Sequence, residues 1–110
     1  MAVIEGGRIL AGSSAGAMIC GGQMWVPGVG WREGLGVVPH IALIPHHATL
    51  GSHWNADRIR TSLPDGITLV GIDEATALLG PPWEVLGPGQ VVLYRGEEKM
   101  HFTDGQAVFL

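Results

Sequence analysis

Short apolar runs separated by turn-forming segments dominate the first part of the chain. Arg8–Ala11, Ile41–Ile44 and Ile67–Ile72 are almost continuous in apolar residues and lack the alternation of a half-exposed strand. Such runs are typical of strands that are buried on both faces. Between them, Ala15–Gly21 and Asn55–Leu63 have patterns that favour helices. Buried strands that alternate with helices predict one mainly parallel sheet.

The pattern changes after Pro82, where turn residues recur at short intervals. Glycine- or aspartate-containing turns there separate four short predicted strands, which are Trp83–Leu86, Val91–Arg95, Lys99–Phe102 and Gln106–Leu110. We therefore expect an α/β part over residues 1–80 and a small antiparallel β extension over residues 81–110. Gln23–Gly36, rich in glycine and tryptophan, follows neither period and is predicted to be a long loop.

A serine-containing turn follows the first predicted strand directly, in the order Gly12, Ser13, Ser14, Ala15, Gly16. In a nucleophile elbow, a serine at a sharp strand-to-helix bend has its hydroxyl pushed into solvent, and flanking glycines relieve the crowding. Free N–H groups and the positive end of a helix at this place stabilise an oxyanion. The pattern indicates a nucleophilic serine. The alternative is an ordinary turn in which Ser13 or Ser14 caps a helix.

Polar side chains also follow the other two predicted strands. His46 and His47 end the second strand, and Asp73 and Glu74 come directly after the third. Because ligands bind at the carboxyl ends of strands in open α/β sheets, we expect these groups to lie near Ser14. A serine needs a base to take its proton, and a carboxylate orients the imidazole that does so. The order of residues therefore predicts a serine hydrolase with a Ser–His–carboxylate triad.

Four blocks of the sequence follow one another in a distinctive order, namely Gly12–Ala17, Gly34–Pro39, Ile44–His46 and Gly71–Leu78. In this order they resemble the cyanophycinase-like and dipeptidase E-like serine peptidases of the class I glutamine amidotransferase-like superfamily. The resemblance implies a three-layer α/β sandwich with a mainly parallel sheet. Since the serine turn of that family lies in the middle of the domain, we expect residues 1–110 to be a partial peptidase domain that lacks the N-terminal half.

The resemblance also implies roles for single residues. Ser14 is expected to be the nucleophile, His46 the general base and Glu74 the third member of the triad. The backbone N–H of Ala15 is expected to form one half of the oxyanion hole. Members of the family cleave short or unusual peptides that end in, or are linked through, acidic residues. In this chain Ile44–Pro45 stands where cyanophycinases carry an aspartate–glutamine pair, which argues against cyanophycin as the substrate.

Alternative catalytic residues lie close to each of these positions. Asp73 is the alternative acid, because only one of two adjacent carboxylates readily turns into a crevice. His47 replaces an aromatic residue of the family and should face away from His46, since successive side chains alternate in an extended segment. His53 is expected near the start of the second predicted helix. The alternative bases are therefore His47 and His53.

Other classes of site fit the sequence less well. An α/β-hydrolase fragment would use Ser14, Asp73 and His101 in that order, but His101 falls within a predicted strand. A metal site would draw on His46, His47, His53 and Asp73. The side chains of the adjacent His46 and His47 point to opposite faces of an extended segment, and no metal-binding motif is present. The glycines of the serine turn are not followed by the Lys-Ser/Thr pair of a phosphate loop. We therefore expect no metal ion and no cofactor.

Composition and charge further limit the classes of function that fit the chain. The 110 residues form one domain at most, 46% of them are hydrophobic, and the net charge is −4. Without a basic cluster, nucleic acid is not an expected partner, and no apolar run is long enough to span a membrane. Cys20, the single cysteine, lies in an apolar stretch where an inert thiol is expected, and it fits a reducing cytoplasm.

The expected binding partners follow from the predicted peptidase activity and from the predicted half-domain. The expected substrate is a small peptide. Buried strands without their neighbours leave open sheet edges, which favour a homodimer or the binding of a complementary N-terminal half. The non-enzymatic alternative is a half-domain that is inactive on its own, either as a truncated gene product or as an interaction module.

Overall fold

The computed structural model describes residues 11–13, 15–26, 28–47 and 59–110 of the chain. Most of the first predicted strand, and the first part of the predicted helix Asn55–Leu63, lie outside these residues. Within them the elements are α2 (Ala15–Met18), β1 (Gln23–Val26), β2 (Gly30–Glu33), β3 (Ile41–Ile44), β4 (Thr68–Ile72), β5 (Ala77–Leu79), β6 (Trp83–Leu86), β7 (Val91–Arg95), β8 (Glu98–Phe102) and β9 (Ala107–Val108).

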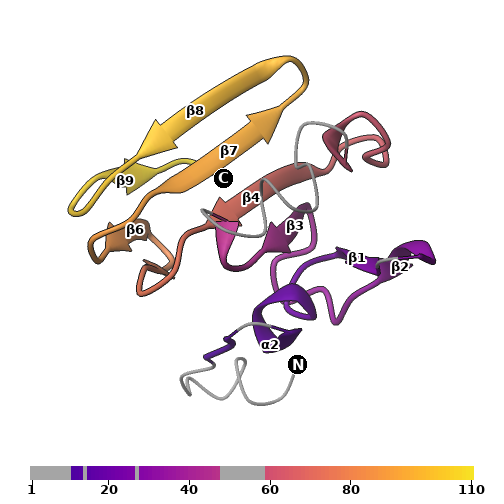
Figure 1. The fold of residues 1–110 in the computed structure, drawn as a ribbon, viewed down its shortest axis with the longest axis horizontal. Coiled ribbons are helices and arrows are strands. Elements are labelled where there is room, and N and C mark those ends of the chain that lie inside the picture. Colours follow the sequence, from indigo (N-terminus) through magenta and orange to yellow (C-terminus); the bar gives the residue numbers. More distant parts are fainter. Residues whose placement is uncertain (1–10, 14, 27, 48–58) are drawn as a thin grey trace.

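A four-stranded sheet with the order β3-β4-β7-β8 forms the centre of the molecule (Figure 1). β3 and β4 run parallel, with Ile44 opposite Gly71. β7 runs antiparallel to β4, and β8 returns antiparallel to β7 through a turn at Gly96, whose φ of 60° is left-handed. α2 and the β1–β2 hairpin lie next to β3, at the opposite end of the sheet from β8 (Figure 1).

Two smaller antiparallel sheets complete the described structure. β1 and β2 form a hairpin in which Trp25 lies opposite Trp31, with ring centroids 5.4 Å apart. β5, β6 and β9 form a three-stranded sheet with the order β5-β6-β9. In the described part of the chain, no helix is long and apolar enough to cross a membrane.

The two faces of the central sheet carry separate hydrophobic clusters, because successive side chains of a strand point to opposite sides. One cluster joins the sheet to β6 and β9 and contains Ile41, Leu43, Val70, Val85, Val91, Leu93 and Val108. The other contains Ala42, Ile44, Ile59, Leu69, Val92 and Tyr94, with both tryptophans of the hairpin packed against it. β3 and β4 are therefore covered on both faces, as their continuous apolar runs predict.

The predicted three-layer α/β sandwich with a mainly parallel sheet is wrong. Of the six strand pairs among the described residues, only β3–β4 is parallel, and α2 is a helix of four residues. A continuous apolar run reports burial on two faces but does not give the direction of the neighbouring strand. The C-terminal strands also do not stand apart as an extension, because β7 pairs directly with β4. The observed fold consists of small mixed and antiparallel sheets.

Predictions for single elements had mixed outcomes. The strands at Ile41–Ile44 and Ile67–Ile72 are confirmed as β3 and β4. The long loop predicted at Gln23–Gly36 is wrong, because this segment contains the β1–β2 hairpin. Gly28 and Gly30, with φ of 77° and 105°, supply the left-handed conformations that its turn requires. The four strands predicted after Pro82 are found as β6, β7, β8 and β9, of which β9 is only two residues long where five were predicted.

Candidate functional site

A cleft of about 460 Å³ opens where the carboxyl ends of β3 and β4 approach the segment that leads into α2. Its polar lining residues come from three segments and are Ser13, His46, Asp73, Glu74 and Thr76. The rest of its described lining is small or apolar and comprises Ala11, Gly12, Ala17, Cys20, Val37, Val38, Ile41, Leu43, Pro45, Ile72, Ala75, Ala77, Leu78, Leu79 and Trp83. The cleft therefore joins the serine turn, the histidine segment and the acidic pair.

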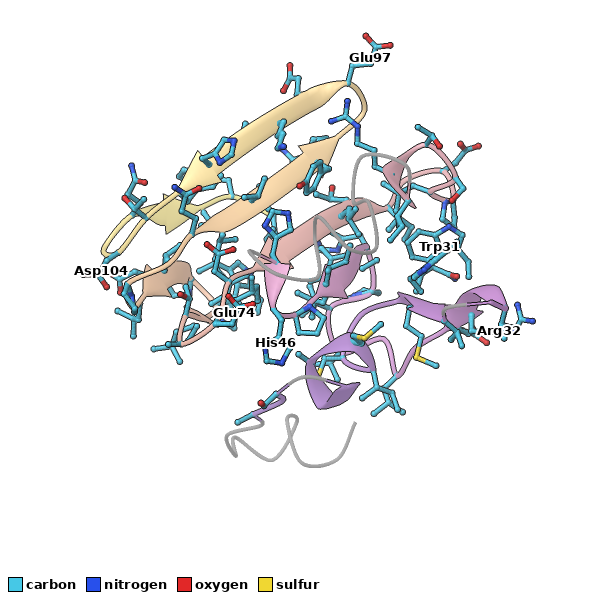
Figure 2. All side chains as sticks on the ribbon, in the orientation of Figure 1. Trp31, Arg32, His46, Glu74, Glu97 and Asp104 are labelled. Carbon is cyan, nitrogen blue, oxygen red and sulfur yellow. The ribbon has the colours of Figure 1, made fainter. Side chains whose placement is uncertain are left out.

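His46 and Glu74 face each other at this cleft. The Nδ1 atom of His46 lies 3.9 Å from Oε1 of Glu74, and the two side chains are 48% and 41% exposed. This separation is an ion-pair contact and is longer than a hydrogen bond. Figure 2 shows His46 between Glu74 and the α2 turn. Among the described residues, Nε2 of His46 has no hydrogen-bond partner, so it is available to a group in the cleft.

The backbone is strained on both sides of this pair. His46 has a φ of 52°, and Ala75, which directly follows Glu74, has a φ of 54°. A left-handed conformation costs a residue with a side chain about 1–2 kcal/mol, and it persists only where surrounding contacts hold it. The strain therefore marks the two turns that carry the imidazole and the carboxylate.

His47 turns to a different set of partners. Its Nδ1 lies 3.4 Å from Oδ1 of Asp73, and its Nε2 lies 2.5 Å from the hydroxyl of Tyr94. Burial lowers the pKa of His47, and the Asp73 carboxylate opposes part of that shift. A neutral imidazole carries one donor and one acceptor, so Nδ1–H donates to Asp73 and Nε2 accepts from the Tyr94 hydroxyl. Both ring nitrogens of His47 are thus occupied.

The turn at Asp73 and Glu74 is tied to the loop that precedes β7. The Asp73 N–H donates to the carbonyl of Gln90 at 3.0 Å, and the Gln90 N–H donates back to Oδ2 of Asp73 at 2.8 Å. The hydroxyl of Thr76 donates to the Glu74 carbonyl at 3.0 Å and accepts from the Gly89 N–H at 2.9 Å. These bonds engage the Asp73 carboxylate and leave that of Glu74 facing His46.

The predicted catalytic residues fall into three groups. His46 and Glu74 share the cleft with Ser13. Ser14 and His53 lie outside the described residues. Ala15, the predicted oxyanion donor, is the first residue of α2.

The alternative residues are placed differently. Asp73 lines the cleft, but its carboxylate is bound by His47 and the Gln90 N–H. His101 lies on β8 with its Nδ1 2.9 Å from Oε1 of Gln90, and it does not line the cleft. Within the described ranges, no group of three His, Cys, Asp or Glu residues is arranged to hold a metal ion.

Tyr94 is the residue of this region that sequence reasoning missed. It is 1% exposed on β7, and Arg60 and Lys99 lie over its ring at 5.7 and 5.3 Å from the centroid. The available signal was a tyrosine inside the apolar run of β7, because a buried tyrosine hydroxyl needs a hydrogen-bond partner. The identity of that partner, His47, is not readable from the run itself.

Comparison with known proteins gives a structural match. No family model and no curated protein matches the chain. Among solved structures, it is similar to the crystal structure of a peptidase from an acI-B1 Actinobacterium, with a TM-score of 0.79 and 30% sequence identity. The similarity covers 94% of this chain and 46% of that chain, so this chain spans about half the length of that peptidase. The chain therefore has the fold of part of a peptidase.

Proposed function

We propose that the chain is a serine peptidase whose triad is Ser14, His46 and Glu74. The observation that carries the proposal is the cleft in which His46 and Glu74 meet Ser13, the residue that precedes Ser14. The similarity to a peptidase over 94% of the chain favours the same class of reaction. The order of the four sequence blocks favours serine as the nucleophile.

In this mechanism the Ser14 hydroxyl attacks the carbonyl carbon of the scissile peptide bond while Nε2 of His46 takes the hydroxyl proton. Glu74 accepts a hydrogen bond from Nδ1–H, which orients the ring and stabilises the imidazolium. The 3.9 Å between them shortens when substrate excludes water, as is common for catalytic contacts. His46 gives the proton to the leaving amine, and the same base then activates the water that hydrolyses the acyl-serine ester.

His46 is the better base of the two adjacent histidines because of its partners. A general base needs a ring nitrogen that can accept a proton from the nucleophile. Nε2 of His46 has no partner among the described residues, whereas Nε2 of His47 already accepts from the Tyr94 hydroxyl. His47 is also only 14% exposed, against 48% for His46.

The lining of the cleft favours a peptide with an apolar side chain next to the scissile bond. Val38, Leu78 and Trp83 contribute apolar surface, and the acidic members are Asp73 and Glu74. No lysine or arginine is found among the described lining residues. An acidic substrate side chain would therefore meet like charge, in contrast to the acidic substrates that the family resemblance implies.

The proposed oxyanion hole needs a second hydrogen-bond donor from a partner. The Ala15 N–H is the proposed first donor, and the chain spans 46% of the peptidase that it resembles. We propose that a complementary polypeptide, or a second copy of this chain, supplies the second donor. Loss of one such donor costs about 10²–10³ in kcat, so the chain alone is expected to be a slow enzyme.

A half-domain that is inactive without its partner is the second candidate function. It is favoured by the same observation, namely that the chain spans only 46% of the peptidase that it resembles.

The proposal includes a cytoplasmic location. A single cysteine, Cys20, leaves the chain without an internal disulfide, which suits a reducing compartment. The location is tested separately from the activity. The chain is fused to a reporter protein, and fractionation of the cells then shows the compartment that contains the fusion.

Peptide hydrolysis by two serine variants tests the proposed function. Ser14→Ala should abolish hydrolysis of short apolar peptides, and the matched Ser13→Ala should retain it. Both measurements are made on the 110-residue chain and on a fusion to the part of the Actinobacterium peptidase that it does not match. Hydrolysis that persists in Ser14→Ala would rule out Ser14 as the nucleophile.

A further inference from the structure

The second histidine–carboxylate pair takes no part in the proposed proton transfers, yet it is bonded more tightly than the first. We infer that His47, Asp73 and Tyr94 form a clamp that positions His46 and Glu74 for catalysis. This inference rests on the proposed function. The three residues are called the clamp below.

The clamp and the proposed catalytic pair are carried by the same two turns. His47 follows His46 directly, and Asp73 directly precedes Glu74. A contact between His47 and Asp73, at 3.4 Å, therefore sets the distance between the backbones that carry the other pair. The catalytic contact itself, at 3.9 Å between two half-exposed side chains, is too loose to set that distance alone.

The backbone at His46 needs such a restraint. Its φ of 52° is left-handed, which a residue with a side chain adopts only when its neighbours hold it there. The His47 ring packs against β4 at Gly71, where an added Cβ would overlap the imidazole. Gly71 lies opposite Ile44 in the sheet, so the chain has folded back over β4 within the three residues that follow β3.

The clamp is anchored in the centre of the sheet through Tyr94. This side chain is 1% exposed on β7, and Arg60 and Lys99 both lie over its ring. Its hydroxyl is 2.5 Å from Nε2 of His47, and the two rings are tilted by 59° at a centroid distance of 5.7 Å. A hydroxyl held this firmly fixes the orientation of the His47 ring.

Two of the three clamp residues, His47 and Tyr94, act through the backbone and have no direct contact with the proposed substrate site, whereas Asp73 also lines the cleft. Neither His47 nor Tyr94 lines the cleft. Both nitrogens of the His47 ring are occupied, so it has no nitrogen with which to take a proton from the nucleophile. The two residues are therefore positioning residues, and His47 stands at a position where the family resemblance expects an aromatic side chain.

Steady-state kinetics of three variants test the clamp. Tyr94→Phe removes the hydroxyl and keeps the ring, and we expect kcat to fall about 10²-fold with KM unchanged, the effect of misplacing a catalytic group by roughly 1 Å. His47→Leu should do the same, whereas His47→Gln, which keeps a donor and an acceptor, should restore most of kcat. His40→Gln is the matched control, because His40 is an exposed histidine outside the clamp and outside the cleft lining. Circular dichroism of each variant checks that it is folded.

A second measurement follows the distance between His46 and Glu74 directly and does not depend on catalysis. In the full chain, nuclear Overhauser effects between the His46 ring and the Glu74 side chain should be lost in Tyr94→Phe and His47→Leu and be kept in His47→Gln and His40→Gln. Unchanged Overhauser effects and unchanged kcat in a folded Tyr94→Phe variant would overturn the clamp. Loss of these effects in a chain whose hydrolysis does not depend on Ser14 would leave the clamp standing and refute the proposed function instead.

Discussion

At the scale of single residues, two adjacent histidines differ because their ring nitrogens have different partners. His46 offers a free Nε2 among the described residues, and His47 uses both nitrogens for Asp73 and Tyr94. We expect His46→Gln to lower kcat for peptide hydrolysis about 10²–10⁴-fold, the usual contribution of a general base. The exposed His40 is the control, and His40→Gln should leave kcat unchanged. Equal effects of the two variants would contradict the assignment.

The lowered pKa of His47 gives the stability of the chain a pH dependence of known sign. Burial lowers this pKa below the value of about 6.5 in the unfolded chain, while Asp73 opposes the shift and Lys99 and His101 add to it. The unfolded state therefore binds a proton more readily than the folded state. The contribution of His47 to the free energy of unfolding is complete above about pH 6.5 and decreases as the pH falls through the lower folded value.

Urea unfolding between about pH 7.5 and about pH 5 measures this effect. We expect the free energy of unfolding to fall on acidification, and to fall less in His47→Gln, which has no titrating ring. A His47→Gln variant with the same pH dependence as the parent chain would show that other groups produce it.

The sequence predicts the chemistry of these residues better than their contacts. His46 and Glu74 were selected from the polar positions after two apolar runs and from the family resemblance, and the two side chains do meet at the cleft. The partner of His47 was missed, because Tyr94 is 47 positions away along the chain. That contact depends on an antiparallel pairing of β4 and β7 that no local pattern encodes.

At the scale of elements, β4 depends on a glycine at the point where the His47 ring crosses it. A Cβ at Gly71 would overlap the His47 ring, which cannot move freely because both its nitrogens are bonded. We expect Gly71→Ala to lower the free energy of unfolding by about 1–3 kcal/mol, as overpacking does. Gly16→Ala is the control, because a Cβ there meets nothing within 4 Å. Equal stability of the two variants would mean that the ring is not packed against β4.

The strands were predictable where the pattern of apolar residues and turns in the sequence is strong. The apolar runs of β3 and β4 and the regular turns after Pro82 led to the right strands. The β1–β2 hairpin was missed, because its four-residue strands show no clear alternation and its burial is intermediate along β1. The pairing of Trp25 with Trp31 stabilises it, and that is a contact across strands rather than a pattern along one.

At the scale of the whole molecule, the charge of the cleft bears on substrate choice. Its described lining joins apolar side chains such as Leu78 and Trp83 to the carboxylates Asp73 and Glu74. We expect kcat/KM for a peptide with leucine beside the scissile bond to exceed that for the aspartate analogue at least about 10-fold. Paired assays of two otherwise identical peptides measure the ratio. A preference for aspartate would mean that a cationic group outside the described lining governs binding.

The direction of the strands is the property of the whole molecule that the sequence did not predict. Burial of β3 and β4 on both faces is typical of parallel sheets, and these two strands are indeed parallel. The same burial is reached on the far side of β4 by an antiparallel partner, β7, together with cover from β6 and β9 on one face. Apolar content along a strand cannot distinguish these two solutions.

The most direct test of the proposed triad is the site of reaction with a fluorophosphonate, which phosphonylates serines that are activated by a neighbouring base and loses fluoride. After labelling of the folded chain and proteolysis, mass spectrometry should locate the adduct on Ser14, and His46→Gln should abolish it while Ser13→Ala leaves it intact. An adduct on Ser13 or on another serine, or an adduct on Ser14 that does not depend on His46, would contradict the account.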